Sequence, residues 1–483
     1  MFKPILDIFK YIKVFQIYLG LRMYLIYFLS IIASFLEGIG ILMMLPLLES
    51  IDSNDSSIVE ENNFLNSMIY KIIEFLGLTN SITSILVLIT ISFTLKGIIS
   101  FFSLGLNAYL LGQLLKEIKL KLFHFYTKMS YGYFTTKNTG DLINLITEQP
   151  TRSLEAFRQL TSLVSYTINT IVLIVLAFFM TFSFGLMSMI TGFILIFLFL
   201  KMNSFVQMLS RIAAKENGIL NKWLVQTLHG FKYLISTSQI EVVKRNIKKS
   251  IYILTNTQVK SGIASAFTQS VREPLAVIFI AIIIYIQVVV FDLKIESILV
   301  SIVLFYRSLN STLAIQSSFQ GTFQLIGSME MVHSEFLSQK ENTELNGNVS
   351  LKNFKKEISF ENVNFKYDNT ESEILKSISF KIPLNSSIAI IGESGSGKTT
   401  IVDLITLTNN ATGGIISIDG IQVNKIIKDS WRRQIGYVSQ DGLIFDDTIS
   451  NNISMWTDNY KESRSKNNNQ IRKVAEQANI LEF

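Results

Sequence analysis

The stretch IAIIGESGSGKTTIVDLI, Ile388–Ile405, decides the fold of the C-terminal part of the chain. An apolar run leads into G-x-x-x-x-G-K-T, and a run with helical character follows. The glycines let backbone N–H groups turn inward around phosphate oxygens, where the positive end of the helix dipole also attracts them. Lys398 can reach the β- and γ-phosphates of a nucleotide, and the Thr399 hydroxyl can bind Mg²⁺. The residues expected to contact ATP are Gly392, Glu393, Ser394, Gly395, Ser396, Gly397, Lys398, Thr399 and Thr400.

Three β-branched or alternating runs precede or enter this loop and are predicted strands. They are EISFENVNFKY (357–367), LKSISFKI (375–382) and SSIAIIG (386–392), and KTTIVDLITL (398–407) is a predicted helix. A strand, a glycine loop and a helix in this order form the structural context that a phosphate loop requires.

The rest of the chain has the composition of a membrane protein. Hydrophobic residues make up 49% and charged residues only 17%, and the mean hydropathy is +0.38. No cysteine is present and histidines number three, so a disulfide framework is excluded and a zinc site is disfavoured. A helix needs about 20 apolar residues to cross a bilayer. Six segments meet that length: 22–48, 82–111, 160–182, 184–203, 265–291 and 294–314.

Charge predicts how these spans are oriented. The segment from Lys201 to Ala264 carries ten basic and two acidic residues, so it should be cytoplasmic. The loop between the second and third spans is also basic, whereas residues 51–80 are acidic and fit the outer side. Both termini are then cytoplasmic, and residues 1–21 read as an amphipathic helix on the membrane surface. The net charge of +6 follows this pattern, which leaves a DNA- or RNA-acting ATPase without support.

Composition divides the chain into four parts, with apolar residues at helical spacing through both long cytoplasmic loops. The expected divisions are a surface helix at 1–21, a six-helix transmembrane domain at 22–316 with loops at about 112–159 and 204–264, a helix extension and linker at 317–350, and a nucleotide-binding part at 351–483.

Three ionisable residues lie near the middle of predicted spans, namely Glu37, Lys96 and Arg307. Ionisable groups are rare there and usually face a partner or an aqueous path. One hypothesis places Lys96 and Arg307 on the substrate path, where they receive an anionic headgroup such as a lipid-linked phosphate. The alternative is that Glu37 pairs with a neighbouring cation to fix helix packing.

Over essentially its whole length the chain resembles an ABC exporter half-transporter. That resemblance implies a multi-domain membrane protein, with a six-helix all-α transmembrane domain followed by a partial α/β P-loop ATP-binding domain. FENVNFKYDN resembles the adenine-stacking loop and implies that Tyr367 stacks on the base, although Tyr367 could instead be an ordinary strand-end aromatic. WRRQIGYVSQDGLIFDDTISNNI resembles the Q-loop segment, which implies that Gln440 contacts Mg²⁺ or the attacking water.

The resemblance also implies partners, a cargo and a location. Half-transporters pair as homodimers or heterodimers, and their cytoplasmic loops couple the two domains. FLEGIGILMMLPLLE and YFTTKNTGDLIN are similar to segments of flippases for glycans and lipid-linked oligosaccharides, although lipid and drug exporters share the architecture. We therefore expect a multi-pass protein, of a bacterial inner membrane, with a lipid, a lipid-linked glycan or a similar amphiphile as cargo.

The pattern of the family continues beyond RKVAEQANILEF with a signature loop, an Asp-Glu strand and a switch histidine, and these do not occur in the 483 residues. Hydrolysis needs an aligned nucleophile and charge stabilisation as well as phosphate binding. The sequence therefore predicts that this chain binds ATP without hydrolysing it at normal rates alone. We expect a fragmentary or interrupted gene product, and a stable short form as the lesser explanation. Two functions remain open: an ATP-hydrolysing translocase, or a non-hydrolytic membrane subunit that needs a complete partner.

Overall fold

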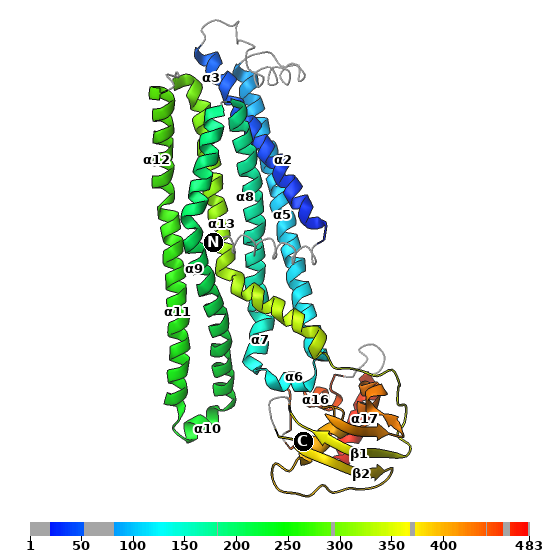
Figure 1. Ribbon diagram of the computed structural model, residues 1–483. Coiled ribbons are helices and arrows are strands. Elements are labelled where there is room, and N and C mark those ends of the chain that lie inside the picture. The colour runs from blue at the N-terminus through cyan, green and yellow to red at the C-terminus, as the bar shows by residue number, and fades with distance from the viewer. Residues whose placement is uncertain are drawn as a thin grey trace. The chain divides into compact units, whose positions relative to one another are not determined.

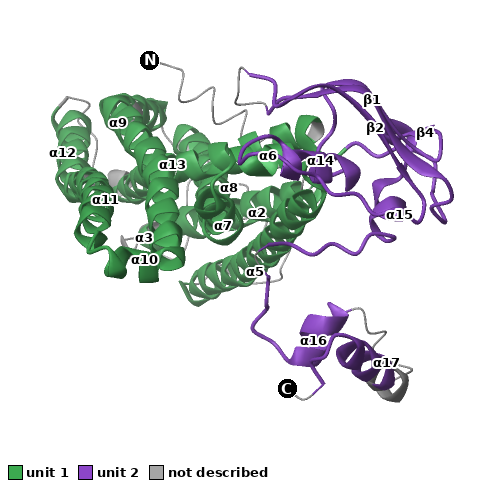
Figure 2. Ribbon diagram, turned by 90° about the horizontal axis from the view of Figure 1, so that it is seen from below, with its two compact units in different colours: residues 1–344 green, residues 345–483 purple. Residues whose placement is uncertain are grey.

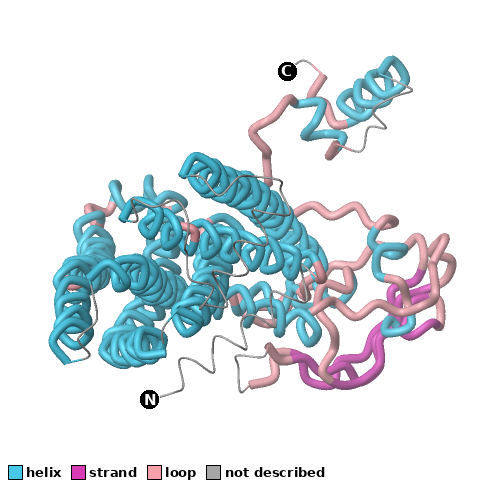
Figure 3. The backbone as a smooth tube through the Cα atoms, turned by 90° about the horizontal axis from the view of Figure 1, so that it is seen from above, coloured by secondary structure: helices cyan, strands magenta, loops and turns pink. Residues whose placement is uncertain are grey.

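The computed structural model describes residues 20–52, 82–180, 182–290, 295–367, 372–440, 442–456 and 464–481. The chain forms two compact units, Met1–Glu344 and Leu345–Phe483 (Figure 2). All four named strands belong to the second unit (Figure 3). Most of the predicted surface helix at 1–21 and of the predicted outer loop at 51–80 lies outside the described residues.

The first unit consists of long helices joined by short ones (Figure 1). The long helices are α2 (Arg22–Leu42), α5 (Ile82–Lys128), α8 (Gln149–Met180), α9 (Phe182–His229), α11 (Ile240–Ser270) and α13 (Ile295–Asn342). The shorter elements are α3 (Met44–Asp52), α6 (Tyr131–Thr136), α7 (Thr139–Thr147), α10 (Phe231–Ser236), α12 (Arg272–Tyr285) and a π-helical turn, Ile286–Val290.

Six helical segments therefore carry the six predicted spans. Five of them are long and apolar enough to cross a membrane: Arg22–Leu48, Ile82–Lys128, Thr139–Phe179, Phe182–His229 and Ile240–Val289. The sixth span, predicted at 294–314, falls on α13, which is helical but less apolar. At 1.5 Å per residue the 47-residue α5 is about 70 Å long, more than twice the hydrocarbon thickness. The helices thus continue well beyond the spans, as the loop periodicity predicts.

Prolines explain where several of these helices break. A proline ring clashes with the carbonyl four residues earlier and removes one helical hydrogen bond. Pro46 accounts for the end of α2 at Leu42, and Pro274 accounts for the end of α11 at Ser270. Pro150 lies in the first turn of α8, where its missing N–H has no helical partner to lose.

Packing in the first unit is closest where α13 runs along α8 and α9, and where α2 runs along α5. The largest apolar core joins α5 to α8 and α13 through side chains such as Leu122, Phe157 and Phe323, all at most 1% exposed. On the same helix α5, Phe101 and Phe102 remain 72% and 60% exposed. Exposed apolar side chains of this kind fit contact with lipid tails, because the tails are as apolar as the side chains and water is not.

The second unit contains a four-stranded antiparallel sheet in the order β2-β1-β3-β4. Its strands are β1 (Glu357–Phe365), β2 (Leu375–Pro383), β3 (Gly413–Ile418) and β4 (Ile421–Gln422). The helices are α14 (Lys398–Ile405), α15 (Lys428–Arg432), α16 (Ile449–Ser454) and α17 (Arg464–Gln477), with a 3₁₀ turn at Val423–Lys425. Phe360 of β1, Leu404 of α14 and Trp431 of α15 meet in one core, so the sheet positions α14.

The predicted strands at 357–367 and 375–382 are confirmed as β1 and β2, and the helix predicted at 398–407 is confirmed as α14. The strand predicted at 386–392 is wrong, because these residues form no strand. A strand needs a neighbour for its N–H and C=O groups, and no backbone ladder in the described part of the chain includes residues 387–392. Ile388 and Ile391 are 47% and 92% exposed, so the apolar run that suggested a strand stands unpaired.

Candidate functional site

The phosphate loop has the backbone conformation that its glycines predict. Gly395 and Gly397 adopt φ angles of +86° and +90°, in the left-handed region that side chains disfavour. Gly397 is also buried, and a Cβ atom there would lie 2.7 Å from Cδ2 of Leu375. Sheet packing and loop conformation therefore both require glycine at 397, which is the N-cap of α14.

The Lys398 side chain folds back over the loop. Its Nζ donates to the carbonyl oxygens of Gly392 and Glu393 at 2.9 and 2.7 Å. Neither carbonyl carries a full charge, so phosphate oxygens are stronger acceptors for the same ammonium group. The ammonium therefore already lies at the mouth of the loop, where a nucleotide phosphate would compete for it.

The two threonines in the first turn of α14 differ in their exposure. Thr399 is exposed, so its hydroxyl is available to a ligand or a metal ion. Thr400 is 4% exposed, and its Oγ1 lies 3.4 Å from the phenolic oxygen of Tyr367. The N–H groups at this helix start have no helical partners, so α14 presents both donors and a positive dipole end to the loop.

Tyr367 therefore lies beside α14, the helix that follows the phosphate loop. Its ring meets Phe365 edge to face, with ring centroids 4.9 Å apart, and it packs against the sheet core. Glu393, Ser394 and Ser396 are the remaining predicted residues of the phosphate loop, and all three are exposed. The Ser396 N–H donates to the Glu393 carbonyl at 3.2 Å.

Gln440 is not joined to this site. It is exposed, and no hydrogen bond among the described residues connects it with residues 392–400. Residues 435–439, which lead into Gln440, are irregular. Val438 is 95% exposed, so the segment lacks the neighbouring strand that could hold Gln440 near the phosphates.

The three ionisable residues of the spans come together from α2, α5 and α13. Lys96 Nζ lies 2.7 Å from Glu37 Oε2, and Arg307 Nη1 lies 3.5 Å from Glu37 Oε1. Glu37 is 5% exposed, whereas the side chains of Lys96 and Arg307 are 27% and 49% exposed. One buried carboxylate therefore orients two partly accessible cations, and the trio carries one net positive charge. This pairing is what the packing hypothesis expects, and the exposure of both cations also leaves room for the substrate hypothesis.

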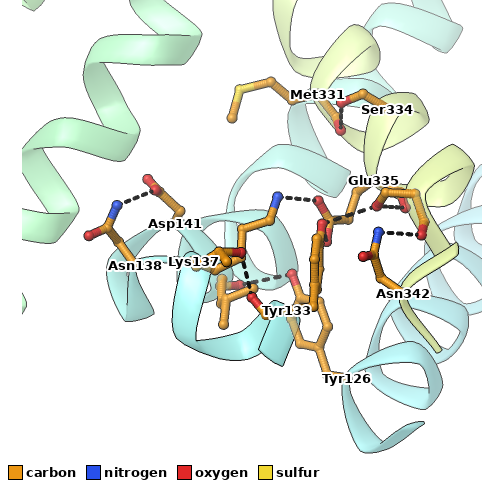
Figure 4. A network of polar contacts seen from close by, with 12 residues as sticks. Tyr126, Tyr133, Lys137, Asn138, Asp141, Met331, Ser334, Glu335 and Asn342 are labelled. Carbon is orange, nitrogen blue, oxygen red and sulfur yellow. Dashed lines mark hydrogen bonds and ion pairs between the residues drawn. The ribbon is translucent and has the colours of Figure 1, made fainter. Parts of the chain in front are cut away.

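A second polar cluster joins α6 to α13 (Figure 4). The Tyr133 hydroxyl donates to Glu335 Oε1 at 3.2 Å, and Lys137 Nζ donates to Glu335 Oε2 at 3.3 Å. Lys137 also lies 4.7 Å from the centre of the Tyr133 ring. Burial lowers the pKa of Lys137, but the hydrogen bonds and negative charge around it outweigh burial and raise its pKa overall.

Backbone contacts reinforce the same connection. The Ser130 N–H donates to the Asn342 carbonyl at 2.9 Å, and the Glu344 N–H donates to the Lys128 carbonyl at 2.8 Å. The end of α5 and the start of α6 are thereby fastened to the last turn of α13. Sequence reasoning missed Glu335, which is 4% exposed, because nothing local distinguishes it from the other charges of a polar helix.

Comparisons with known proteins bear on both units. A family model described as ABC transporter transmembrane region matches residues 23–313, and one described as ABC transporter matches residues 375–483. An "ATP-dependent lipid A-core flippase" of Vibrio vulnificus is 26% identical over 396 residues, which cover 80% of this chain and 66% of that protein. A protein of the same name from Wigglesworthia glossinidia brevipalpis is 28% identical over 403 residues, covering 80% and 66%. The "Heterocyst differentiation ATP-binding protein HepA" of a Nostoc species is 25% identical over 377 residues, covering 77% and 60%. The chain thus spans about two thirds of the length of these relatives, or less.

Proposed function

The chain belongs to the ABC transporter family, and from that premise we propose that it serves ATP-driven export or flipping of an amphiphile across a membrane. Relatives named as lipid A-core flippases support a lipid or a lipid-linked glycan as the cargo class. The observation that carries the ATP part is the phosphate loop, where Lys398 lies over left-handed glycines at the start of α14.

ATP and Mg²⁺ fit the residues that are present. Gly395 and Gly397 open the backbone, Lys398 supplies the ammonium group, and Thr399 offers an exposed hydroxyl. Mg²⁺ when bound neutralises phosphate charge, and we propose Thr399 as one of its ligands. Gln440 is proposed as a second ligand only once residues 435–440 move toward the phosphates, because the structure does not connect it to the loop. Tyr367 is proposed to contact the adenine, which its position beside α14 supports.

Binding is proposed to start when the phosphates take over the Lys398 ammonium group from the carbonyls of Gly392 and Glu393. The loop N–H groups and the α14 dipole then hold the phosphate oxygens, and Gly397 keeps the loop close to Leu375 and the sheet. These steps retain the nucleotide and orient it. They do not by themselves align a water for hydrolysis, for which the described residues supply no positioned base.

We propose the membrane-spanning part as the cargo path, with Lys96 and Arg307 facing it and Glu37 orienting both cations. Their net positive charge favours an anionic group next to the trio. The basic loops support cytoplasmic placement of the ATP-binding unit and of both termini, in a bacterial inner membrane. A second half-transporter, identical or different, is the proposed partner.

A transport assay tests the proposal. Because the loop residues do not by themselves align a water, the assay pairs this chain with a second half-transporter that carries the hydrolytic motifs. Proteoliposomes containing the pair should move a fluorescent lipid between leaflets faster with MgATP than without it, and Lys398→Ala should abolish the difference. Lys376→Ala is the matched control, because Lys376 is an exposed lysine of the same unit outside the loop. Equal movement by the wild-type and Lys398→Ala proteins would contradict ATP-driven export through this loop.

A further inference from the structure

The C-terminal end of α14 is held by side chains of α15. A helix leaves its last carbonyl groups without helical partners, so other donors satisfy them where water does not. Trp431 Nε1 donates to the Ile405 carbonyl at 2.7 Å. Arg432 donates from Nε to the Thr406 carbonyl at 3.1 Å and from Nη2 to the Leu407 carbonyl at 2.6 Å. Two neighbouring residues of α15 therefore bind three consecutive carbonyl groups where α14 ends.

Charge and packing reinforce this connection between α14 and α15. The C-terminus of a helix carries a partial negative charge, which attracts a guanidinium group and its several N–H donors. Trp431 is 4% exposed and lies in the same core as Leu404 of α14. Its ring also meets that of Phe354 edge to face, with centroids 5.6 Å apart. A shift of α14 would therefore carry α15 with it, because leaving α15 behind would break the hydrogen bonds and the core contact together.

The same part of the chain holds a segment near the start of the second unit, residues 346–354, here called the strap. The Leu351 N–H donates to Ser430 Oγ at 2.9 Å, and Gln434 Nε2 donates to the Leu351 carbonyl at 2.8 Å. Gln434 Oε1 accepts from the Phe354 N–H at 2.9 Å. The strap is also hydrogen-bonded to residues 425–428 through Asn346, Gly347, Asn348 and Val349.

The phosphate loop and the strap are thus joined through one short element. The loop leads into α14, α14 is bound by Arg432, and the residues around Arg432 bind the strap. The strap in turn follows α13 within a few residues, because α13 ends at Asn342. These connections lie within the second unit up to the strap, and the chain itself makes the last one.

We propose that α15 conveys nucleotide binding from the phosphate loop to the strap, and so to the end of α13. Arg432 and Gln434 act as positioning residues, and the inference rests on the proposed binding of ATP at this loop. When phosphates take the Lys398 ammonium group from its carbonyl partners, the start of α14 takes a new position. With only eight residues, α14 moves as one body, so its last carbonyls move with its start. Arg432 passes that movement to α15, and Gln434 passes it to the strap.

Hydrogen exchange of the full chain in nanodiscs, followed by mass spectrometry, tests this assignment. In the wild type, saturating MgATP should slow exchange of the strap amides about two- to fivefold, because the nucleotide orders α14 and the hydrogen bonds that depend on it. Arg432→Met should lose this response. Coupling between two sites is reciprocal, so Arg432→Met should weaken ATP binding by about the same factor at most.

Three further variants make the test specific. Arg433→Met is the matched control, because Arg433 is the next residue, has the same charge and is exposed. It should keep the response. Gln434→Leu breaks the connection to the strap and leaves the donors of Arg432 in place, so it should lose the response even if Arg432→Met proves too unstable to study. Arg432→Lys keeps a cation at the α14 carbonyls and should recover part of the response.

A purely structural role for α15 predicts a different result. Arg432→Met would then speed exchange throughout β1 and β2, with and without nucleotide, and the strap would still respond to MgATP. That result, or a wild-type strap whose exchange is the same with and without MgATP, would overturn the proposal. A response that survives in Gln434→Leu would overturn it as well.

The same samples separate this proposal from the proposed function. Saturable ATP binding that depends on Lys398, without any response of the strap, would refute only the coupling through α15. A strap response that depends on Arg432, without MgATP-driven lipid movement in the transport assay, would refute only the transport function.

Discussion

Glu37→Gln should destabilise the helical unit, because one carboxylate holds two cations inside the spans. The Lys96 contact is short, at 2.7 Å, and involves a buried acceptor, so its loss should cost about 1.5–3 kcal/mol. The Arg307 contact is longer, at 3.5 Å, and its cation is half exposed, so solvent screening reduces its share to about 0–1 kcal/mol. Together they predict that the free energy of unfolding falls by about 1.5–4 kcal/mol.

A double-mutant cycle isolates the Glu37–Lys96 contact. Unfolding of wild type, Glu37→Gln, Lys96→Met and the double variant is measured by denaturant titration in mixed micelles. The double variant should lose about 1–2 kcal/mol less than the sum of the single variants, because removing both partners leaves neither charge uncompensated. Additive losses would refute the reasoning.

An exposed pair provides the matched control for this cycle. Lys244 Nζ lies 2.8 Å from Glu241 Oε1 on α11, almost the same distance as in the buried pair. Both side chains are more than half exposed, so water and salt screen their attraction. The corresponding variants, Glu241→Gln and Lys244→Met, should show no measurable coupling, and a coupling equal to that of Glu37 and Lys96 would show that burial is not the cause.

Three further results are expected. Gly397→Ala should destabilise the ATP-binding unit more than Gly395→Ala in thermal unfolding. Both glycines have positive φ, but only at 397 would the added Cβ atom also lie 2.7 Å from Leu375 Cδ2. Equal losses would contradict this account. Hydrogen bonds from Asn451, Trp456 and the Thr448 N–H lower the pKa of Asp447, so the local structure that it stabilises is present above the ordinary aspartate pKa of 3.8 and should be lost only as the pH falls below that value. Trp456 fluorescence should report this loss, and Asp447→Asn should lack the acid transition. Lys137→Met should cost about 1–2 kcal/mol through its contact with buried Glu335, discounted for the 30% exposure of Lys137, and should speed amide exchange in α6; unchanged exchange would argue against the connection to α13.

The sequence predicted those features that depend on local pattern. Apolar length located the helices that carry the spans, because a bilayer imposes the same length requirement everywhere. The glycine pattern predicted a loop whose backbone N–H groups turn inward. The left-handed conformation of Gly395 and Gly397 fits such a loop, because only glycine adopts that conformation without strain. Helix breaks at Pro46 and Pro274 follow from the same local chemistry, and a closer interpretation of the sequence could have predicted them.

Features that depend on residues distant in the sequence could not be predicted from local pattern. Residues 386–392 have the composition of a strand, but a strand exists only when a neighbour pairs with it. Glu37 could be singled out as an intramembrane charge, yet its simultaneous contact with α5 and α13 depends on how three helices pack. The pocket lined by α2, α5 and α8 likewise combines residues up to 143 positions apart, from Ile26 to Asn169, and no single helix signals it.

Equilibrium binding of ATP to the full chain, measured with and without Lys398→Ala, tests the central claim most directly. The account predicts saturable, Mg²⁺-dependent binding by the wild type, a loss of about tenfold or more in affinity in Lys398→Ala, and unchanged affinity in Lys376→Ala. Binding of equal affinity in all three proteins would place the nucleotide elsewhere and contradict the assignment of the loop. Absence of binding to the wild type would contradict an ATP-driven function for this chain.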